Sequence, residues 1–301
     1  MESKKMYKYK ITVFTPTYNR AYIIGNLYES LKKQTFTDFE WVVVDDGSND
    51  NTEQLFDEWL NIDTKFSIRY YKKQNGGKHT AINKGLELAE GKLFLTVDSD
   101  DYLTNDALEK IVQWENELHD DKYCGVSGNL GVSTGETPNT IFKGEYVDCT
   151  ALDRYGIIDG ERAFAFYTDI HRKYLYPVFE NEKFMTEAVT WNRMANDGYK
   201  MRFFSDVICI YEYQNDGLTK TGSSVFINNP KGYGLWLKEK SKFMKDSLIK
   251  RLKMYYTFTF DLAKYYDSKT IADCIGAPSL LIKLFTCIYK LKYRKSDNKV
   301  R

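Results

Sequence analysis

The sequence has few of the residues that cross-link a chain or bind metals through sulfur and nitrogen. Its 301 residues contain three histidines and five cysteines. The cysteines stand far apart, without the spacing of a disulfide framework or a zinc site; they are Cys124, Cys149, Cys209, Cys274 and Cys287. We therefore expect a reduced, cytoplasmic setting.

Long apolar runs are also absent. Residues 1–10 are polar and basic and lead directly into a strand, so we expect no signal peptide. The apolar stretch 280–291 is interrupted by Lys283 and is too short and too charged for a membrane span. No repeat or low-complexity segment is present, and 43% apolar residues with 16% aromatics are ample for a packed core.

Charge is balanced overall but unevenly distributed. Residues 220–301 carry 18 basic and 6 acidic side chains, whereas residues 1–219 carry 25 basic and 36 acidic ones. The basic region therefore suits an anionic surface, and a basic amphipathic helix lying on an anionic bilayer is one interpretation. A helix that packs on the rest of the protein with a solvated basic fringe is the other. Nothing in the sequence indicates nucleic acid as a partner.

Four strand-then-helix units fill the first 118 residues. Apolar strands are predicted over 10–14, 40–44, 66–71 and 93–97, and each is followed by apolar residues at helical spacing. This alternation predicts a parallel, doubly wound sheet. All four strands end in polar residues, at the edge where open α/β sheets bind ligands.

The pattern loosens beyond Cys124. We expect strands near 123–127 and 141–146, helices around 160–167 and 184–196, closing strands over 201–204 and 207–213, and a turn at 216–217. A domain boundary near residue 225 would separate a domain 1–225, with halves of about 1–118 and 119–225, from a mainly helical, basic region 226–301.

Acidic residues end the fourth predicted strand. Asp98, Asp100 and Asp101 cannot be buried without a cation, basic side chains or water. Mg²⁺ or Mn²⁺ carrying a diphosphate would suit these oxygen ligands, and a solvated acidic turn would explain them equally well. The Gly and Glu of an EF-hand loop, the Gly-x-Gly-x-x-Gly turn of dinucleotide-binding folds and a phosphate-loop lysine motif are all missing.

Four motifs in order resemble a known family. They are Thr15–Arg20, Val44–Ser48, Asn75–Gly77 followed by Ala81, Asn83 and Gly85, and Val97–Asp101. Together they are similar to family 2 glycosyltransferases, closely over about the first 110 residues and more loosely to about residue 220. The resemblance implies the GT-A fold: an α/β, Rossmann-like, mostly parallel sheet flanked by helices, here with a C-terminal helical extension.

The resemblance also implies a nucleotide site. Pro16, Tyr18 and Asp46 would hold a uridine, since a carboxylate can accept the imide N–H of uracil and a tyrosine can stack on its flat face. Packing at a strand end is the alternative for Tyr18. The alternative for Asp46 is that it is a turn residue that caps the next helix. This interpretation fits Asp45 or Ser48 about as well.

The Asp-x-Asp motif would handle the rest of the donor. By resemblance Asp98 lies near the ribose or sugar, Asp100 binds the metal that bridges the diphosphate, and Asp101 orients its neighbours. Asn83 and Ser99 are counted with the nucleotide-binding residues as members of these motifs.

Two further residues stand beside the glycine motif. Lys78 and His79 could face phosphates or be solvated. Some relatives add a later histidine as metal ligand, but no histidine follows His171. His171 and His119 are therefore expected to be structural or exposed, with the metal resting on Asp100, the diphosphate and water. Trp191 is expected in the core, and a sugar platform is its alternative.

The segment 179–191 resembles the part of the family that supplies the catalytic base. This sequence has Ala188 where many relatives have Asp, which makes Glu187 the candidate, with Glu182 and Glu180 in reserve. An inverting transfer needs such a carboxylate to take the proton of the acceptor hydroxyl. A plain first-turn acid of a helix with Thr186 as N-cap is the alternative, and both can hold.

These observations predict a metal-dependent, inverting glycosyltransferase that uses Mn²⁺ or Mg²⁺. It would move a sugar from a nucleotide donor, a UDP-sugar by preference, to a saccharide or lipid-linked saccharide in surface polysaccharide synthesis. It would work in the cytoplasm, at the inner face of the cell membrane if the basic region binds lipid. The alternatives are a nucleotidyltransferase that uses a nucleoside triphosphate and a catalytically inactive nucleotide- or glycan-binding module.

Overall fold

The computed structural model describes residues 7–134, 136–137, 139, 141–158, 160–212 and 222–297. The chain divides into two compact units. The first comprises residues 1–176 and 193–215, and the second comprises 177–192 and 216–301. The predicted turn at 216–217 lies outside the described residues, and the functional boundary near residue 225 stays a prediction.

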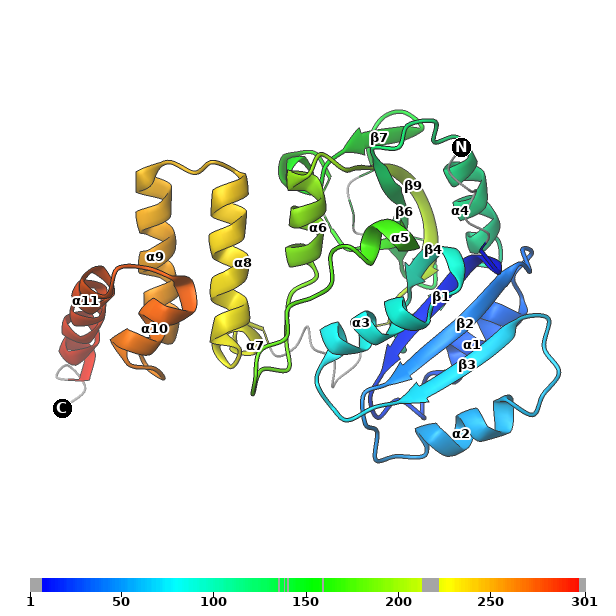
Figure 1. The fold of residues 1–301 in the computed structure, drawn as a ribbon, viewed down its shortest axis with the longest axis horizontal. Helices are drawn as coiled ribbons and strands as arrows, with labels where there is room; N and C mark the ends of the chain where they lie inside the picture. The colour runs from blue at the N-terminus through cyan, green and yellow to red at the C-terminus, as the bar shows by residue number, and fades with distance from the viewer. Residues whose placement is uncertain are drawn as a thin grey trace. The chain divides into compact units, whose positions relative to one another are not determined.

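The described residues of the first unit form one nine-stranded sheet in the order β3-β2-β1-β4-β8-β6-β9-β5, with β7 paired to β9. The strands are β1 Tyr9–Thr17, β2 Phe39–Asp45, β3 Ser67–Lys72, β4 Gly91–Thr96, β5 Tyr102–Leu103, β6 Tyr123–Gly131, β7 Tyr146–Cys149, β8 Arg162–Tyr167 and β9 Lys200–Ile210. The first four run parallel, as does β6 with β9, and the remaining pairs are antiparallel. The predicted α/β class is confirmed, and the sheet is mixed beyond β4 (Figure 1).

Helices cover both faces of this sheet. They are α1 Gly25–Lys32, α2 Thr52–Trp59, α3 Lys78–Leu88, α4 Ala107–Asn116, the 3₁₀ helix η1 Asp153–Gly156, α5 Thr168–His171 and α6 Ala188–Asn196, which crosses into the second unit. Successive side chains of a strand point to opposite faces of the sheet. Ile11 and Val13 join the core under α1, α2 and α4. Phe14 instead meets α3, where a Cβ on Gly85 would lie 2.2 Å from the Phe14 ring.

Three predictions beyond Cys124 were wrong. In place of the helix expected around 160–167, Arg162–Tyr167 form strand β8, and the strand expected over 141–146 begins only at Tyr146. The two closing strands are a single strand, β9, whose register against β6 shifts between Ser127 and Asn129. Because β8 lies between β4 and β6 with residues buried on both faces, its apolar run has no strand period that sequence could reveal.

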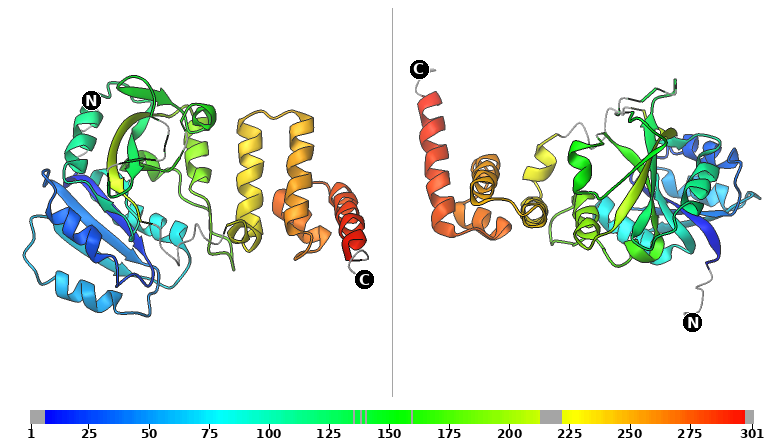
Figure 2. Two further views of the ribbon diagram at one scale, coloured as in Figure 1. Left: turned by 180° about the vertical axis from the view of Figure 1, so that it is seen from behind. Right: turned by 90° about the horizontal axis from the view of Figure 1, so that it is seen from above.

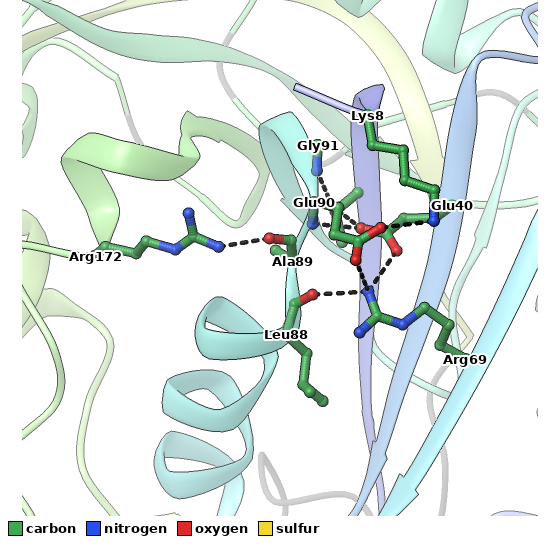
Figure 3. Close-up of polar contacts among 9 residues, drawn as sticks. Lys8, Glu40, Arg69, Leu88, Ala89, Glu90, Gly91 and Arg172 are labelled. Carbon is green, nitrogen blue, oxygen red and sulfur yellow. Dashed lines mark hydrogen bonds and ion pairs between the residues drawn. The ribbon is translucent and has the colours of Figure 1, made fainter. Parts of the chain in front are cut away.

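Two arginines hold the carboxyl end of α3 (Figure 3). Arg69 donates to the carbonyl of Leu88 at 2.8 Å, and Arg172 donates to that of Ala89. Arg69 is itself paired with the buried carboxylate of Glu40 at 3.0 Å. Because guanidinium groups favour the negative end of a helix, these contacts fix α3 and therefore the position of its first turn.

The second unit is mainly helical (Figures 1 and 2). Its helices are α7 Ser224–Ile227, α8 Pro230–Phe243, α9 Leu248–Leu262, α10 Ser268–Ile275 and α11 Ser279–Asp297. Its core is a cluster that includes Phe258, Leu262, Ile271 and Ile282. Across the part of the chain that the structure describes, no helix is both long enough and apolar enough to span a membrane.

Candidate functional site

The carboxyl ends of β1, β2 and β4 lie at one edge of the parallel part of the sheet (Figure 1). Thr17, the last residue of β1, pairs with Asp45, the last residue of β2. Phe14 of β1 pairs with Thr96, the last residue of β4. The three segments that follow these strands, which carry the family-like motifs, therefore leave the sheet together.

The loops after β1 and β2 are tied to one another. Asp45 is fully buried and accepts the Ser48 N–H at 2.7 Å, which closes a tight turn. The Ser48 hydroxyl accepts the N–H of Asn19 at 2.8 Å, and the Asn19 side chain accepts the N–H of Asn49 at 2.8 Å. Asp45 and Ser48 therefore shape the loops and do not cap α2, which begins further along the chain. These contacts hold Tyr18 at the edge with 45% of its surface exposed, so a flat ring could stack on it.

Asp46 is buried and holds the loop before α3. Its carboxylate accepts from Lys73 Nζ at 2.5 Å, from the Gly76 N–H at 2.9 Å and from the Gly77 N–H at 2.6 Å. We call these four residues the Asp46 clamp. A carboxylate offers about four acceptor directions, so the clamp leaves room for the imide N–H of uracil. The role of Lys73 was not predicted, because no local signal distinguishes it from a solvated lysine.

The first turn of α3 brings a lysine to the Asp-x-Asp segment. Lys78 Nζ lies 2.8 Å from each carboxylate oxygen of Asp98. His79 is buried, and this burial lowers its pKa to about 4, so its ring is neutral near pH 7. The alternative that His79 is solvated was therefore wrong.

Asn83 pairs with the backbone of Tyr176. Its amide donates to the Tyr176 carbonyl at 2.9 Å and accepts the Tyr176 N–H at 2.8 Å. These contacts favour a positioning role, because the amide must leave or share them to reach a nucleotide. Nucleotide binding by Asn83 stays a prediction.

Three carboxylates crowd the end of β4. Burial, and then the charge of Asp98, raise the pKa of Asp100 above its ordinary value. Burial, Asp98 and Asp100 together raise the pKa of Asp101 to about 8. The cations of Arg20 and Lys78 act in the opposite direction on Asp100. The role of Arg20 was not predicted, although the residue ends the first motif.

Such a group of acids would be stabilised by a divalent cation, which prefers oxygen ligands. Asp98 and Asp100 are the residues that could hold one, while Ser99 between them is buried. Among the described residues no group of three or more His, Cys, Asp or Glu side chains could hold a metal ion.

The acids proposed as base belong to the second unit and differ in their contacts. Glu182 is buried and accepts the N–H groups of Lys231 and Gly232 at 2.7 and 2.8 Å, so it caps α8. Glu180 is exposed, and Glu187 is half-buried immediately before α6. The Glu187 carbonyl accepts the N–H groups of Thr190 and Trp191, the first helical bonds of α6. Because α6 begins at Ala188, the predicted place of Glu187 in the first turn, with Thr186 as N-cap, was wrong.

The remaining candidates differ in how far they are buried. His171 is buried against the rings of Phe94 and Phe166, with centroids 5.8 and 4.8 Å away, and its burial lowers its pKa to about 3. His119 is exposed, and Trp191 is half-buried. His171 is therefore a structural residue, as predicted.

Comparison with known sequences identifies relatives. The chain is 37% identical over 150 residues to the poly(ribitol-phosphate) beta-N-acetylglucosaminyltransferase TarS of Staphylococcus aureus, which covers 48% of this chain and 25% of TarS. The chain thus spans about a quarter of that relative's length. It is 25% identical over 297 residues to the GalNAc(5)-diNAcBac-PP-undecaprenol beta-1,3-glucosyltransferase of Campylobacter jejuni, covering 93% of this chain and 94% of that protein.

Comparison with solved structures identifies proteins of the same fold. Residues 1–349 of S. aureus TarS in complex with UDP-GlcNAc match with a TM-score of 0.61 and 20% identity, over 95% of this chain and 92% of that one. The mannosyltransferase PcManGT of Pyrobaculum calidifontis, in complex with GDP-Man and Mn²⁺, matches with a TM-score of 0.55 and 19% identity, over 97% and 86%. The expected GT-A fold is thereby confirmed. A sequence profile of glycosyl transferase family 2 matches residues 12–175, more than half of the chain, so this chain belongs to glycosyl transferase family 2.

Proposed function

We propose that this protein is an inverting glycosyltransferase that moves a sugar from a UDP-sugar to a saccharide or lipid-linked saccharide acceptor in surface polysaccharide synthesis. The observation that carries the proposal is the convergence of Tyr18, the Asp46 clamp and the Asp98–Asp101 segment at one sheet edge. The relatives support it, since TarS binds UDP-GlcNAc and the C. jejuni relative is a glucosyltransferase named for an undecaprenol-linked saccharide.

The donor would lie along this edge. Pro16, Tyr18 and Asp46 would hold the uridine, with the base stacked on the exposed Tyr18 ring and its imide N–H donated to Asp46. Asp98 and Ser99 would face the ribose and sugar. Asn83 would orient the segment near Tyr176.

The diphosphate would be held by a cation and basic side chains. Asp100, with Asp98 beside it, would hold Mn²⁺ or Mg²⁺, which supplies neutralisation of the negative charge on the departing diphosphate. Lys78 lies 2.8 Å from Asp98 and would neutralise the same group of acids and phosphates. The Mn²⁺ complex of the related mannosyltransferase supports a divalent cation in this fold.

Glu187 would act as general base. Its carboxylate would take the proton of an acceptor hydroxyl as that oxygen forms a bond to the anomeric carbon. The bond from this carbon to the diphosphate oxygen would break on the opposite face, so the configuration inverts and the nucleoside diphosphate leaves. Glu182 is unsuited to the role because both its oxygens cap α8.

The first experiment measures thermal unfolding with UDP, GDP, CMP and dTDP, each with and without Mn²⁺, on the wild type and on Asp100→Ala. A ligand at about a hundred times its Kd adds about 2.7 kcal/mol to the free energy of unfolding, which a melting curve resolves. We expect UDP to stabilise the wild type only with metal and to have little effect on Asp100→Ala.

Turnover is then measured as release of UDP from a panel of UDP-sugars, with and without a saccharide acceptor. If no nucleoside diphosphate shifts the melt, the donor site is not functional and the proposal fails. If UDP binds but no sugar is transferred or hydrolysed, the protein is a binding module and not an enzyme.

A further inference from the structure

One face of α11 is apolar and exposed. Leu280, Leu284, Ile288 and Leu291 have exposed fractions of 81%, 56%, 39% and 64%. Their spacing of four, four and three residues places them on one side of a helix. We call these four residues the α11 apolar face.

The opposite side of α11 forms its contacts with the rest of the second unit. Ile282 is fully buried there. The rings of Phe285 and Tyr289 pack edge-on against those of Tyr256 and Phe260 of α9, with centroids 5.5 and 5.4 Å apart. The helix is therefore anchored to the rest of the unit through its other side.

Basic side chains border this face. At about 100° of rotation per residue, Lys283 and Lys290 lie along one margin and Lys292 lies along the other. All three are exposed, and residues 279–292 contain no acidic side chain. An apolar stripe between lysines is the arrangement of helices that lie in a membrane interface, where lysine stems extend toward the headgroups.

The start of α9 repeats these features. Leu248 and Ile249 are 67% and 78% exposed, and Lys250, Arg251 and Lys253 are exposed beside them. Helices α9 and α11 pack against one another. A second basic and apolar segment is thus present in the same unit.

We infer that the α11 apolar face inserts into the interface of a bilayer that contains anionic lipids, with Lys283 and Lys290 at the headgroups. Lys292, on the other margin, lies with its Nζ 5.6 Å from the centre of the Phe260 ring of α9. Charge selects this partner, because residues 220–301 carry 18 basic and 6 acidic side chains. A second copy of the same face would instead bring lysines against lysines. The inference rests on the proposed function in one respect: the bilayer is taken to be the membrane that holds the lipid-linked acceptor. Binding of the helix to lipid does not itself require catalysis.

The experiment is flotation of the full chain with vesicles of phosphatidylcholine, with or without phosphatidylglycerol. The wild type is expected to bind the anionic vesicles and to be released by salt. Leu284→Gln and Ile288→Gln together should weaken binding by about tenfold or more for each side chain. Lys283→Gln and Lys290→Gln should each weaken it by about fivefold. Leu60→Gln with Ile62→Gln is the matched control, since both side chains are exposed in the first unit at 47% and 52%.

Point variants are needed because deletion of residues 270–301 would remove Ile271 and Ile282 from the core of the second unit. The inference is overturned if the wild type does not float, or if the Leu284 and Ile288 variant floats like the wild type. Concentration-dependent dimerisation that this variant abolishes, without vesicle binding by the wild type, would overturn it in favour of a second copy.

The melting shift with UDP and Mn²⁺ is recorded on the same samples. Loss of vesicle binding with an intact UDP shift counts against this inference alone. Vesicle binding without a UDP shift counts against the proposed function alone.

Discussion

At the scale of single residues, the pair formed by Lys78 and Asp98 is expected to matter for the reaction. Lys78 neutralises Asp98, which stands next to two acids whose pKa values are already raised. Lys78→Met would leave this charge uncompensated at the donor diphosphate. We expect kcat/KM to fall by about 10- to 100-fold, because a lost charged contact near the reacting groups costs about 1.5–3 kcal/mol.

Lys84→Met is the control for this prediction. Lys84 lies on the same helix, but it pairs with the exposed Glu87 at 2.6 Å, so its loss should change kcat/KM by less than about twofold. Melting temperatures report whether either variant perturbs the fold. Equal activity of the two variants would show that the Lys78 contact has no part in the reaction.

His171 is expected to set part of the pH dependence of stability. Burial lowers its pKa to about 3 from an ordinary value of 6.5, so the unfolded chain binds the proton more readily than the folded protein. The stability contributed by the neutral ring is complete above pH 6.5 and is lost as the pH falls toward 3. Between about pH 7 and about pH 5 this amounts to about 2 kcal/mol.

His171→Phe should remove this part of the slope, because a phenyl ring can pack against Phe94 and Phe166 without a charge to bury. Denaturant unfolding at both pH values measures the difference. The exposed His119, replaced by Gln, is the control and should keep the wild-type slope. Some slope remains in every case, because burial also lowers the pKa of His79, to about 4. If the free energy of unfolding of His171→Phe depends on pH in the same way as that of the wild type, His171 does not contribute to the pH dependence of stability.

At the scale of elements, two acids next to helix starts are expected to have different roles, Glu187 before α6 and Glu182 as the cap of α8. Glu187→Gln should reduce sugar transfer by about 10²- to 10⁴-fold, as expected for loss of a general base, while the UDP melting shift is retained. Glu182→Gln should instead lower the free energy of unfolding by about 1 kcal/mol through the lost helix cap, with transfer by the folded enzyme nearly unchanged. Sugar-transfer rates and melting curves of both variants distinguish the general base from the helix cap. The reverse result would make Glu182 the base.

The elements that sequence predicted well are those with a clear period and clear ends. In β1 and β4, short apolar runs are followed by polar turns, and α1 and α4 show apolar residues at helical spacing. Strand β8 has no such signal, because its Ala and Phe residues are compatible with either structure until its neighbours β4 and β6 are known. Long-range pairing decided its conformation.

The same distinction holds within the site. The places of Tyr18, Asp46 and Asp98 were predictable, because each lies one or two residues after the end of a strand. Their roles in binding stay a prediction from the family resemblance. Their partners were not predictable, since Lys73 is 27 residues from Asp46 in the sequence and is brought there by the order of the strands. Only the structure shows which hydrogen-bonding positions of Asp46 and Asp98 these contacts leave available for a ligand.

At the scale of the whole molecule, the uneven distribution of charge and of exposed apolar surface is the basis of the proposed membrane binding. The acidic residues lie mostly before residue 220 and the basic ones are enriched after it, in the unit that carries the α11 apolar face. An enzyme held at a membrane samples acceptors in that layer at a raised effective concentration. The proposed lipid-linked acceptor would therefore be used more efficiently than the same saccharide in solution.

This difference is the last prediction. With a lipid-linked acceptor in anionic vesicles, Leu284→Gln with Ile288→Gln should lower transfer by at least about tenfold, because less enzyme is bound at limiting lipid. With a short water-soluble acceptor, the same variant should match the wild type, since neither residue belongs to the proposed donor site or to the candidate bases. The control Leu60→Gln with Ile62→Gln should behave as wild type with both acceptors. If the variant loses the same activity with both acceptors, the α11 apolar face is needed for the folded enzyme itself. If the variant is as active as the wild type with both acceptors, membrane binding through this face does not contribute to sugar transfer.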